Sequence, residues 1–221
     1  MTRESRLRRE PLFRMRREDG DIILNFWGAP PEQLRDYAGA FHRAGRKLVE
    51  SFKFRKVSEH VMACPIVYSY RHALELYLKT FVVGARQLLA TRAMDAMPVG
   101  RASVSHRLVD FLPIIELINR SVGWSWDLRV QGLRTYQDFE QLVRDLDRVD
   151  QQSYSFRYPT DKKGTAALPK NFIFNIKHFC SRMDVLLTAL DEAVLGLDGM
   201  ADDTLKQLGN YAEAERSQEE A

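Results

Sequence analysis

Three short stretches of the chain hold the residue types with the greatest capacity for chemistry. They read RHALELYLK (71–79), SHRLVDFL (105–112) and SFRYP (155–159). A histidine transfers protons near neutral pH, and an arginine binds a phosphate and stabilises the charge that develops on it. Together the two residue types favour phosphate-directed chemistry. The candidate catalytic residues are Arg71, His72, His106 and Arg157.

The charged residues of the first stretch share one side of the predicted helix. At 100° per residue, Arg71, His72, Glu75 and Lys79 fall within about a third of the circumference, and the remainder of that helix is apolar. A polar stripe inside a bundle is either satisfied by partners or open to a groove. Because Arg71, Glu75 and Lys79 are four residues apart, an ion ladder within the helix is the structural alternative to a functional groove.

Arg157 stands between two aromatic residues, and the second of them directly precedes Pro159, which is expected to end a helix. One interpretation is a guanidinium positioned to hold a phosphate. The other is a corner clamp, in which Phe156 and Tyr158 stack on the guanidinium while helix carbonyls or Glu75 accept its hydrogen bonds. The sequence leaves both interpretations open.

The surrounding chain predicts five helices, in each of which apolar residues recur at a spacing of three and four. Pro30 and Pro31 suit the first turn of a helix, whereas Pro113 is expected to kink or divide the third one. The expected helices cover residues 30–52, 65–89, 106–124, 128–153 and 170–197, with a short weak helix near 203–208 before the tail frays.

This pattern is typical of an all-α protein, a five-helix up-and-down bundle with a short extended segment near 22–26 and charged tails. The 221 residues are 45% hydrophobic, which is enough to form one substantial core. The expected parts are a basic N-terminal arm (1–20), a single helical domain (21–199) and an acidic C-terminal tail (200–221).

Convergence of the four candidates is not guaranteed by such a bundle. When helices simply alternate in direction, the start of the third helix lies at the opposite end from Arg71. His106 would then reach Arg71 only if a kink at Pro65 or Pro113 intervenes.

The apolar helix with its RHALELYLK core, the His-x-Leu helix start about 30 residues later and the helix that ends in FRYP resemble the HEPN superfamily of small helical bundles. The resemblance covers about residues 35–195 and is greatest to bacterial members outside the best-studied nucleases. It implies a four- or five-helix bundle, frequent homodimerisation and a role around RNA or nucleotides. Many members are metal-independent ribonucleases of toxin–antitoxin, abortive-infection or CRISPR systems, with an Arg-x4-6-His motif.

The chain lacks the histidine of that motif after Arg157. No histidine follows Arg157 before His178. Arg-x4-His pairs do occur at Arg55–His60 and Arg101–His106, but neither pair lies late in a helix as the family pattern requires. We therefore transfer no catalytic role to either pair as a motif.

Composition excludes several classes of protein. No apolar run is long enough to span a membrane, and the N-terminus lacks the apolar centre of a secretory signal, so we expect a cytoplasmic protein. Cys64 and Cys180 are expected to be free thiols. Because phosphate-binding loops, dinucleotide fingerprints, HExxH and paired-cysteine motifs are absent from the sequence, we expect no cofactor and no metal.

Charge is distributed unevenly along the chain. The net charge is only +3, but seven arginines lie within residues 1–20 and six acids within 200–221. The expected partners are RNA or a nucleotide, a second copy of the chain, and a protein that contacts the charged tails.

Two functional hypotheses follow. The first is a HEPN-like, RNA- or nucleotide-directed protein, a metal-independent ribonuclease in a defence or toxin–antitoxin setting. The second is a non-catalytic helical module that dimerises or docks a partner. The positions of the four candidate residues distinguish the two hypotheses. Four residues along one exposed groove favour the ribonuclease, and four separately buried residues favour the non-catalytic module.

Overall fold

The computed structural model describes residues 30–53, 56–91, 105–124, 126 and 132–219. Within these residues the protein has α-helices and no strand, which confirms the expected all-α bundle. The predicted extended segment at 22–26 and the basic arm lie outside the described residues. The elements are α2 (Pro30–Ser51), η1 (Val57–Met62), α3 (Ala63–Thr91), η3 (Leu108–Phe111), α4 (Leu112–Val122), α5 (Tyr136–Val149) and α6 (Ile176–Glu219).

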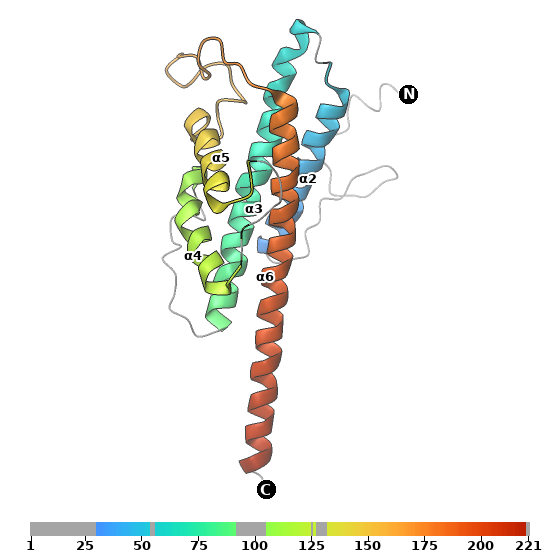
Figure 1. Ribbon diagram of the computed structural model, residues 1–221, viewed down its shortest axis with the longest axis vertical. Coiled ribbons are helices and arrows are strands. Elements are labelled where there is room, and N and C mark those ends of the chain that lie inside the picture. Colours follow the sequence, from blue (N-terminus) through green and yellow to red (C-terminus); the bar gives the residue numbers. More distant parts are fainter. Residues whose placement is uncertain (1–29, 54–55, 92–104, 125, 127–131, 220–221) are drawn as a thin grey trace, which may run out of the picture.

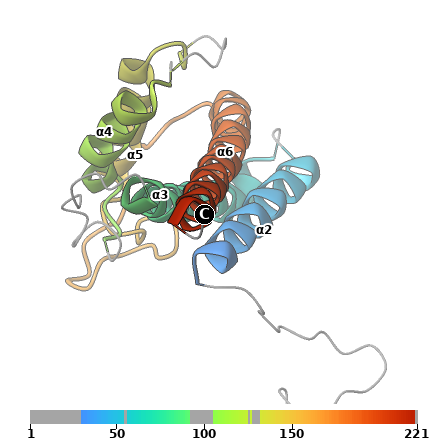
Figure 2. The same cartoon turned by 90° about the horizontal axis from the view of Figure 1, so that it is seen from below.

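Helix α3 lies at the centre of the bundle (Figure 1). Helices α2 and α6 pack along it, and η3 and α4 contact it from another side, with α5 resting on η3 (Figure 2). Helices α3 and α6 run in the same direction, because the segment 150–175 lies at the end of the bundle where α3 begins, and α6 starts there. Strict alternation is therefore not kept between these two helices, although the bundle is all-α.

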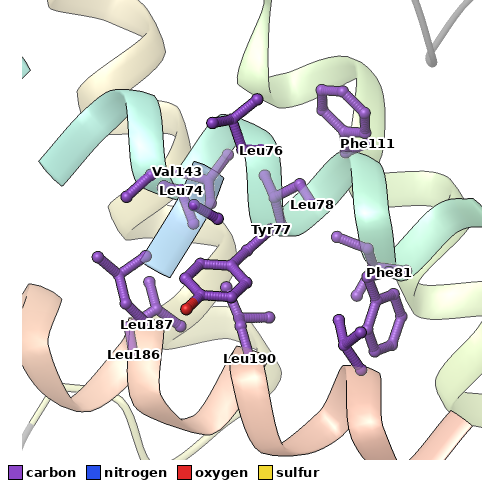
Figure 3. Packing of buried hydrophobic residues seen from close by; sticks show 14 of the residues in the cluster. Leu74, Leu76, Tyr77, Leu78, Phe81, Phe111, Val143, Leu186, Leu187 and Leu190 are labelled. Atoms are coloured by element: carbon purple, nitrogen blue, oxygen red, sulfur yellow. The ribbon is translucent and has the colours of Figure 1, made fainter. Parts of the chain in front are cut away.

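The core is formed where the apolar faces of these helices meet. Leu74 and Leu78 of α3 are fully buried, and Tyr77 lies beside them with its ring directed toward α6 (Figure 3). Phe111 closes the core from η3. The facing side chains of α5 and α6 include Val143, Leu186, Leu187 and Leu190.

Local chemistry explains where three of the helices begin. Thr135 and Asp138 form a reciprocal capping box at the start of α5. Asn175 Oδ1 accepts a hydrogen bond from His178 N at 3.0 Å, which caps the start of α6. Pro113 sits in the first turn of α4, immediately after the 3₁₀ turn η3, so the predicted division of the third helix is confirmed.

The sequence-based bounds of two helices were wrong at both ends; the second, α6, begins at Ile176 rather than at 170. Helix α5 covers Tyr136–Val149 rather than 128–153, because its capping box fixes the start and Asp150 Oδ1 accepts the Tyr154 and Ser155 amides at its end. Helix α6 continues to Glu219, so the expected break after 197 and the weak helix near 203–208 do not occur. No proline interrupts α6, and its buried stripe continues through Ala201.

Cys64 and Cys180 are both free, as expected. Among the described helices, none combines the length and the apolar character that crossing a membrane requires.

Candidate functional site

The centre of the candidate site is a buried ionic cluster on α3. Arg71 and Glu75 are 0% and 1% exposed, and Arg71 Nη1 donates to Glu75 Oε2 at 2.7 Å. Lys79 Nζ donates to Glu75 Oε1 at 2.8 Å from one turn further along. The ion ladder predicted from the four-residue spacing is therefore present. Its members nevertheless have partners beyond the helix.

Arg71 binds two other segments of the chain through its remaining nitrogens. Nη2 donates to the main-chain oxygens of His106 at 2.7 Å and of Asp150 at 3.1 Å, and Nε lies 3.2 Å from Asp150 Oδ2. Every guanidinium nitrogen thus faces an acceptor, and the side chain has no access to solvent. Arg71 is a positioning residue here, because its fully buried guanidinium cannot reach a molecule bound at the surface.

Glu75 is a carboxylate that is buried yet ionised. Burial alone would raise the pKa of Glu75, but hydrogen bonds from Lys79, Arg71 and His106 outweigh it and hold that pKa below its usual value. The result is an anion held within the fold at neutral pH.

His106 is the exposed member of this cluster. Its Nδ1 lies 2.8 Å from Glu75 Oε1, while the side chain remains 63% exposed. Because the carboxylate accepts, Nδ1 carries the proton in the neutral ring, and Nε2 keeps a free lone pair. The arrangement is that of a histidine oriented by a buried acid, with its reactive nitrogen available to solvent.

A second buried carboxylate fixes the segment that carries His106. Asp147 of α5 accepts a hydrogen bond from Leu108 N at 2.9 Å and pairs with Arg107 Nη2 at 3.3 Å. Since Arg71 holds the neighbouring His106 carbonyl, residues 105–108 are anchored from both α3 and α5.

His72 belongs to an aromatic stack on the same face of α3. Its ring lies parallel to Tyr68, with centroids 5.5 Å apart, and edge-on to Phe41 at 4.4 Å. Burial lowers the pKa of His72; the Glu75 charge opposes this effect, whereas Arg71, Lys79 and Arg157 add to it. His72 is therefore neutral near pH 7, and no group of the described residues forms a hydrogen bond with its buried Nδ1.

Arg157 lies over the end of this stack. Its Cζ is 5.5 Å from the Tyr68 ring centroid and 5.7 Å from that of Tyr158, and its Nε donates to Ser153 O at 2.5 Å. The stacking that the corner-clamp interpretation gave to Phe156 and Tyr158 was wrong for Phe156, which is buried and packs against Phe172. Within the described part of the chain, Arg157 forms no ion pair.

The four predicted residues are distributed along one side of α3. Tyr68, His72, Glu75 and Lys79 follow each other at spacings of four, three and four, which places them on one helix face. His106 attaches to Glu75 in the middle of this stripe, and Arg157 covers Tyr68 at one end. The two points are about two helical turns apart, ~10 Å along the axis.

The geometric objection to convergence was wrong. Residues 105–107 lie alongside α3 before η3 and α4 begin, so the main-chain oxygen of His106 reaches Arg71 and its side chain reaches Glu75. Of the four candidates, His106 and Arg157 are exposed, His72 is partly covered and Arg71 is enclosed.

Sequence reasoning missed Asp147, Asp150 and Tyr68 as parts of this site. A signal for the two aspartates was present: Phe139, Val143, Asp147 and Asp150 continue one stripe of α5, so the acids occupy positions that the helical period assigns to the core. For Tyr68 the signal was its position four residues before His72.

Neither Arg-x4-His pair makes a site that the structure describes, because Arg55 and Arg101 lie outside the described residues. In the residues that the structure covers, no cluster of three or more His, Cys, Asp or Glu side chains could hold a metal ion. Comparisons of the chain with protein-family models, with curated proteins and with solved structures found no match.

Proposed function

We propose that this protein is a HEPN-like, RNA-directed protein that cleaves RNA without a metal, with His106 as its proton-transfer group. The observation that carries the proposal is the hydrogen bond from His106 Nδ1 to the buried Glu75, which leaves Nε2 facing solvent. A purely structural ion ladder on α3 has no need of an exposed histidine.

The chemistry assigned to this pair is attack of a ribose 2′-hydroxyl on the adjacent phosphorus. His106 Nε2 takes the hydroxyl proton, the new 2′-oxygen to phosphorus bond forms, and the bond to the 5′-oxygen breaks with a proton supplied by water. Glu75 stabilises the imidazolium that results. A positioned base of this kind contributes about 10²- to 10⁴-fold to the rate.

The neighbouring groups fit a single-stranded polyanion. Arg157 supplies a positive charge that no acid neutralises within the described residues. The side chain of Tyr158, which contacts the guanidinium, is 49% exposed. Tyr154 and Tyr158 stack on each other at 4.5 Å. Exposed aromatic rings next to a guanidinium are suited to stacking with unpaired bases, and the guanidinium to contact with a phosphate.

The test is cleavage of end-labelled single-stranded RNA by purified protein in excess EDTA. We expect the wild type to cleave, and His106→Ala to be slower by about 100-fold or more. The matched control is His60→Ala, which removes another exposed histidine, in η1 and far from this cluster in sequence. Failure of the wild type both to cleave RNA and to bind it in a salt-sensitive way would sink the proposal.

A second candidate function, dimerisation, is supported by a different observation. The buried stripe of α6 formed by Leu190, Val194, Leu197 and Ala201 continues outward as Leu205 and Leu208, which are 50% and 51% exposed. In Figure 1 this part of α6 extends beyond the other helices. An apolar stripe of this kind is suited to pairing with a second copy of α6.

Sedimentation of the full chain tests this second candidate. We expect the wild type to be a dimer and the double variant Leu205→Glu with Leu208→Glu to be a monomer. Leu195→Glu is the control, since Leu195 is equally exposed but lies off the stripe. A monomeric wild type rules out α6 pairing.

A further inference from the structure

A pocket of about 350 Å³ lies between α5 and α6, away from the His106 stripe. Its size is at the lower end of the range of small-molecule sites, roughly 300–1,000 Å³. One wall is aromatic: Phe172 contacts Phe156 at 6.2 Å and Phe174 at 5.5 Å between ring centroids, and Phe174 contacts Phe179 at 6.1 Å. Four phenylalanine rings in succession thus border one cavity.

The opposite wall is aliphatic and belongs to α5. Leu142, Leu146 and Val149 follow each other at the spacing of one helix face and line the pocket. A cavity between a row of aromatic rings and a row of aliphatic side chains favours a flat ligand, whose faces contact both walls at once.

The rim of the pocket carries hydrogen-bonding groups from both helices. Asp145 of α5 presents a carboxylate that is already bonded to Gln141 and Arg148 through Oδ1. His178 of α6 also lines the pocket, and within the described residues its ring has no hydrogen-bond partner. The rim thus offers an acceptor on one side and an imidazole on the other, which donates or accepts according to its tautomer.

The charge at the rim argues against an anionic ligand. Asp138 and Asp145 both line the pocket, whereas Arg182 is the arginine among its lining residues. A phosphate group would therefore meet more negative than positive charge.

We propose that this pocket binds a neutral, planar heteroaromatic compound, of which a purine nucleoside is the representative. The inference does not depend on ribonuclease activity, because it rests on the walls and rim of a cavity that contains none of the four candidate residues. Phe156 of the pocket directly precedes Arg157, so a ligand here would contact the corner that carries the exposed arginine.

The experiment is isothermal titration of the full-length protein with adenosine, adenosine monophosphate and indole. We expect saturable adenosine binding, at least tenfold weaker binding of the monophosphate because of the rim carboxylates, and at least tenfold weaker binding of indole because it lacks ring acceptors. Absence of saturable adenosine binding at millimolar concentration overturns the proposal, as does a preference for the monophosphate.

Two variants locate the binding. Leu142→Trp fills the space between the two walls of the pocket and should abolish adenosine binding, while circular dichroism shows that the protein is still folded and helical. His178→Ala changes only an exposed side chain, so it keeps the test valid if the tryptophan variant fails to fold, and we expect adenosine affinity to fall about three- to tenfold. Lys47→Ala, on the exposed surface of α2 and outside the pocket, should leave the affinity unchanged. Unchanged binding in His178→Ala, or loss of binding in Lys47→Ala, contradicts the assignment.

Discussion

The two arginines of the candidate site have opposite environments. Arg71 is enclosed, and each of its nitrogens faces a carboxylate or carbonyl oxygen, whereas Arg157 lies at the surface over two tyrosine rings, with one hydrogen bond to Ser153 O. The two residues belong to segments that look equally suggestive in the sequence. The difference teaches that burial decides the role of each arginine. The buried one holds segments of the fold together, and the exposed one is accessible to a ligand.

The same contrast separates the two ends of the Glu75 network. Arg71 and Glu75 lie in the interior, where an ion pair is costly to break because the remaining charge stays desolvated. His106 is joined to the same carboxylate but projects into solvent. Variants on the buried side should therefore change stability, and variants on the exposed side should change ligand binding or catalysis.

The largest effect is expected for Arg71→Ala. The substitution leaves Glu75 and the main-chain oxygens of His106 and Asp150 without their shared donor, so the free energy of unfolding in urea should fall by about 3–5 kcal/mol. Lys47→Ala is the matched control: it removes an exposed ion pair to Glu50 and should cost less than about 1 kcal/mol. Equal effects of the two substitutions would contradict a structural role for Arg71.

A smaller loss is expected for Asp147→Ala. The Leu108 amide would lose its acceptor within the core and Arg107 its ionic partner, which predicts a decrease of about 1–3 kcal/mol in the free energy of unfolding. Because residues 105–108 carry His106, RNA cleavage should also slow in this variant under conditions where the protein remains folded. Normal cleavage by a destabilised Asp147→Ala protein would show that the anchoring is irrelevant to His106.

The third prediction concerns pH. Burial holds the pKa of His72 below its usual value of 6.5, so the unfolded chain takes up a proton that the folded protein resists. Above pH 6.5 the His72 ring is neutral in both the folded and the unfolded state. As the pH falls from 6.5 toward the folded pKa of His72, the free energy of unfolding decreases by at most about 1.4 kcal/mol per pH unit. His72→Phe, which keeps an aromatic ring beside Tyr68, should reduce this slope.

Urea unfolding at pH 7.5, 6.5 and 5.5 measures the difference between the two proteins. The range stays above the usual Glu75 pKa of 4.5, and since the folded pKa of that group is lower still, its contribution to stability is fully present throughout. Identical pH dependence in wild type and His72→Phe would show that His72 titrates as freely in the folded protein as in the unfolded chain.

Much of the fold was accessible from the sequence because periodicity reports burial directly. The stripes of α2, α3 and α6 predicted three long helices, and Pro113 predicted the division before α4. The continuation of α6 beyond residue 197 was missed because Asp202 and Asp203 resemble a solvated tail, although Leu205 and Leu208 keep the period. A charged helix that extends beyond the bundle has few buried residues, so the sequence carries little apolar periodicity from which to predict it.

The sequence predicted four residues of the candidate site, but it predicted neither the role of each nor the other members Tyr68, Asp147 and Asp150. Spacing on α3 identified the Arg71, Glu75 and Lys79 ladder, but spacing within one helix carries no information on which other segments approach it. Contacts of Arg71 with Asp150 and His106 join residues that are 79 and 35 positions apart in the chain. The burial of Arg71 and the exposure of His106 follow from these long-range contacts, which no local pattern encodes.

The smallest effect on stability is expected for Arg157→Ala, which sharpens the comparison between the two arginines. The exposed side chain loses one hydrogen bond to a main-chain oxygen and its contacts with Tyr68 and Tyr158, so the free energy of unfolding should fall by less than about 1 kcal/mol. RNA affinity should fall, and the slope of log affinity against log salt should decrease by about 0.7, the value of one phosphate contact on a single strand.

Arg157→Lys separates the two ways in which this arginine could act on RNA. Lysine keeps the charge but not the planar face, so it should restore the salt slope while leaving the affinity below that of the wild type. A fall of about 1–3 kcal/mol in stability with unchanged RNA affinity in Arg157→Ala would instead identify a corner clamp. In that case both arginines would be structural, and the contrast between the buried and the exposed side of the cluster would be limited to His106.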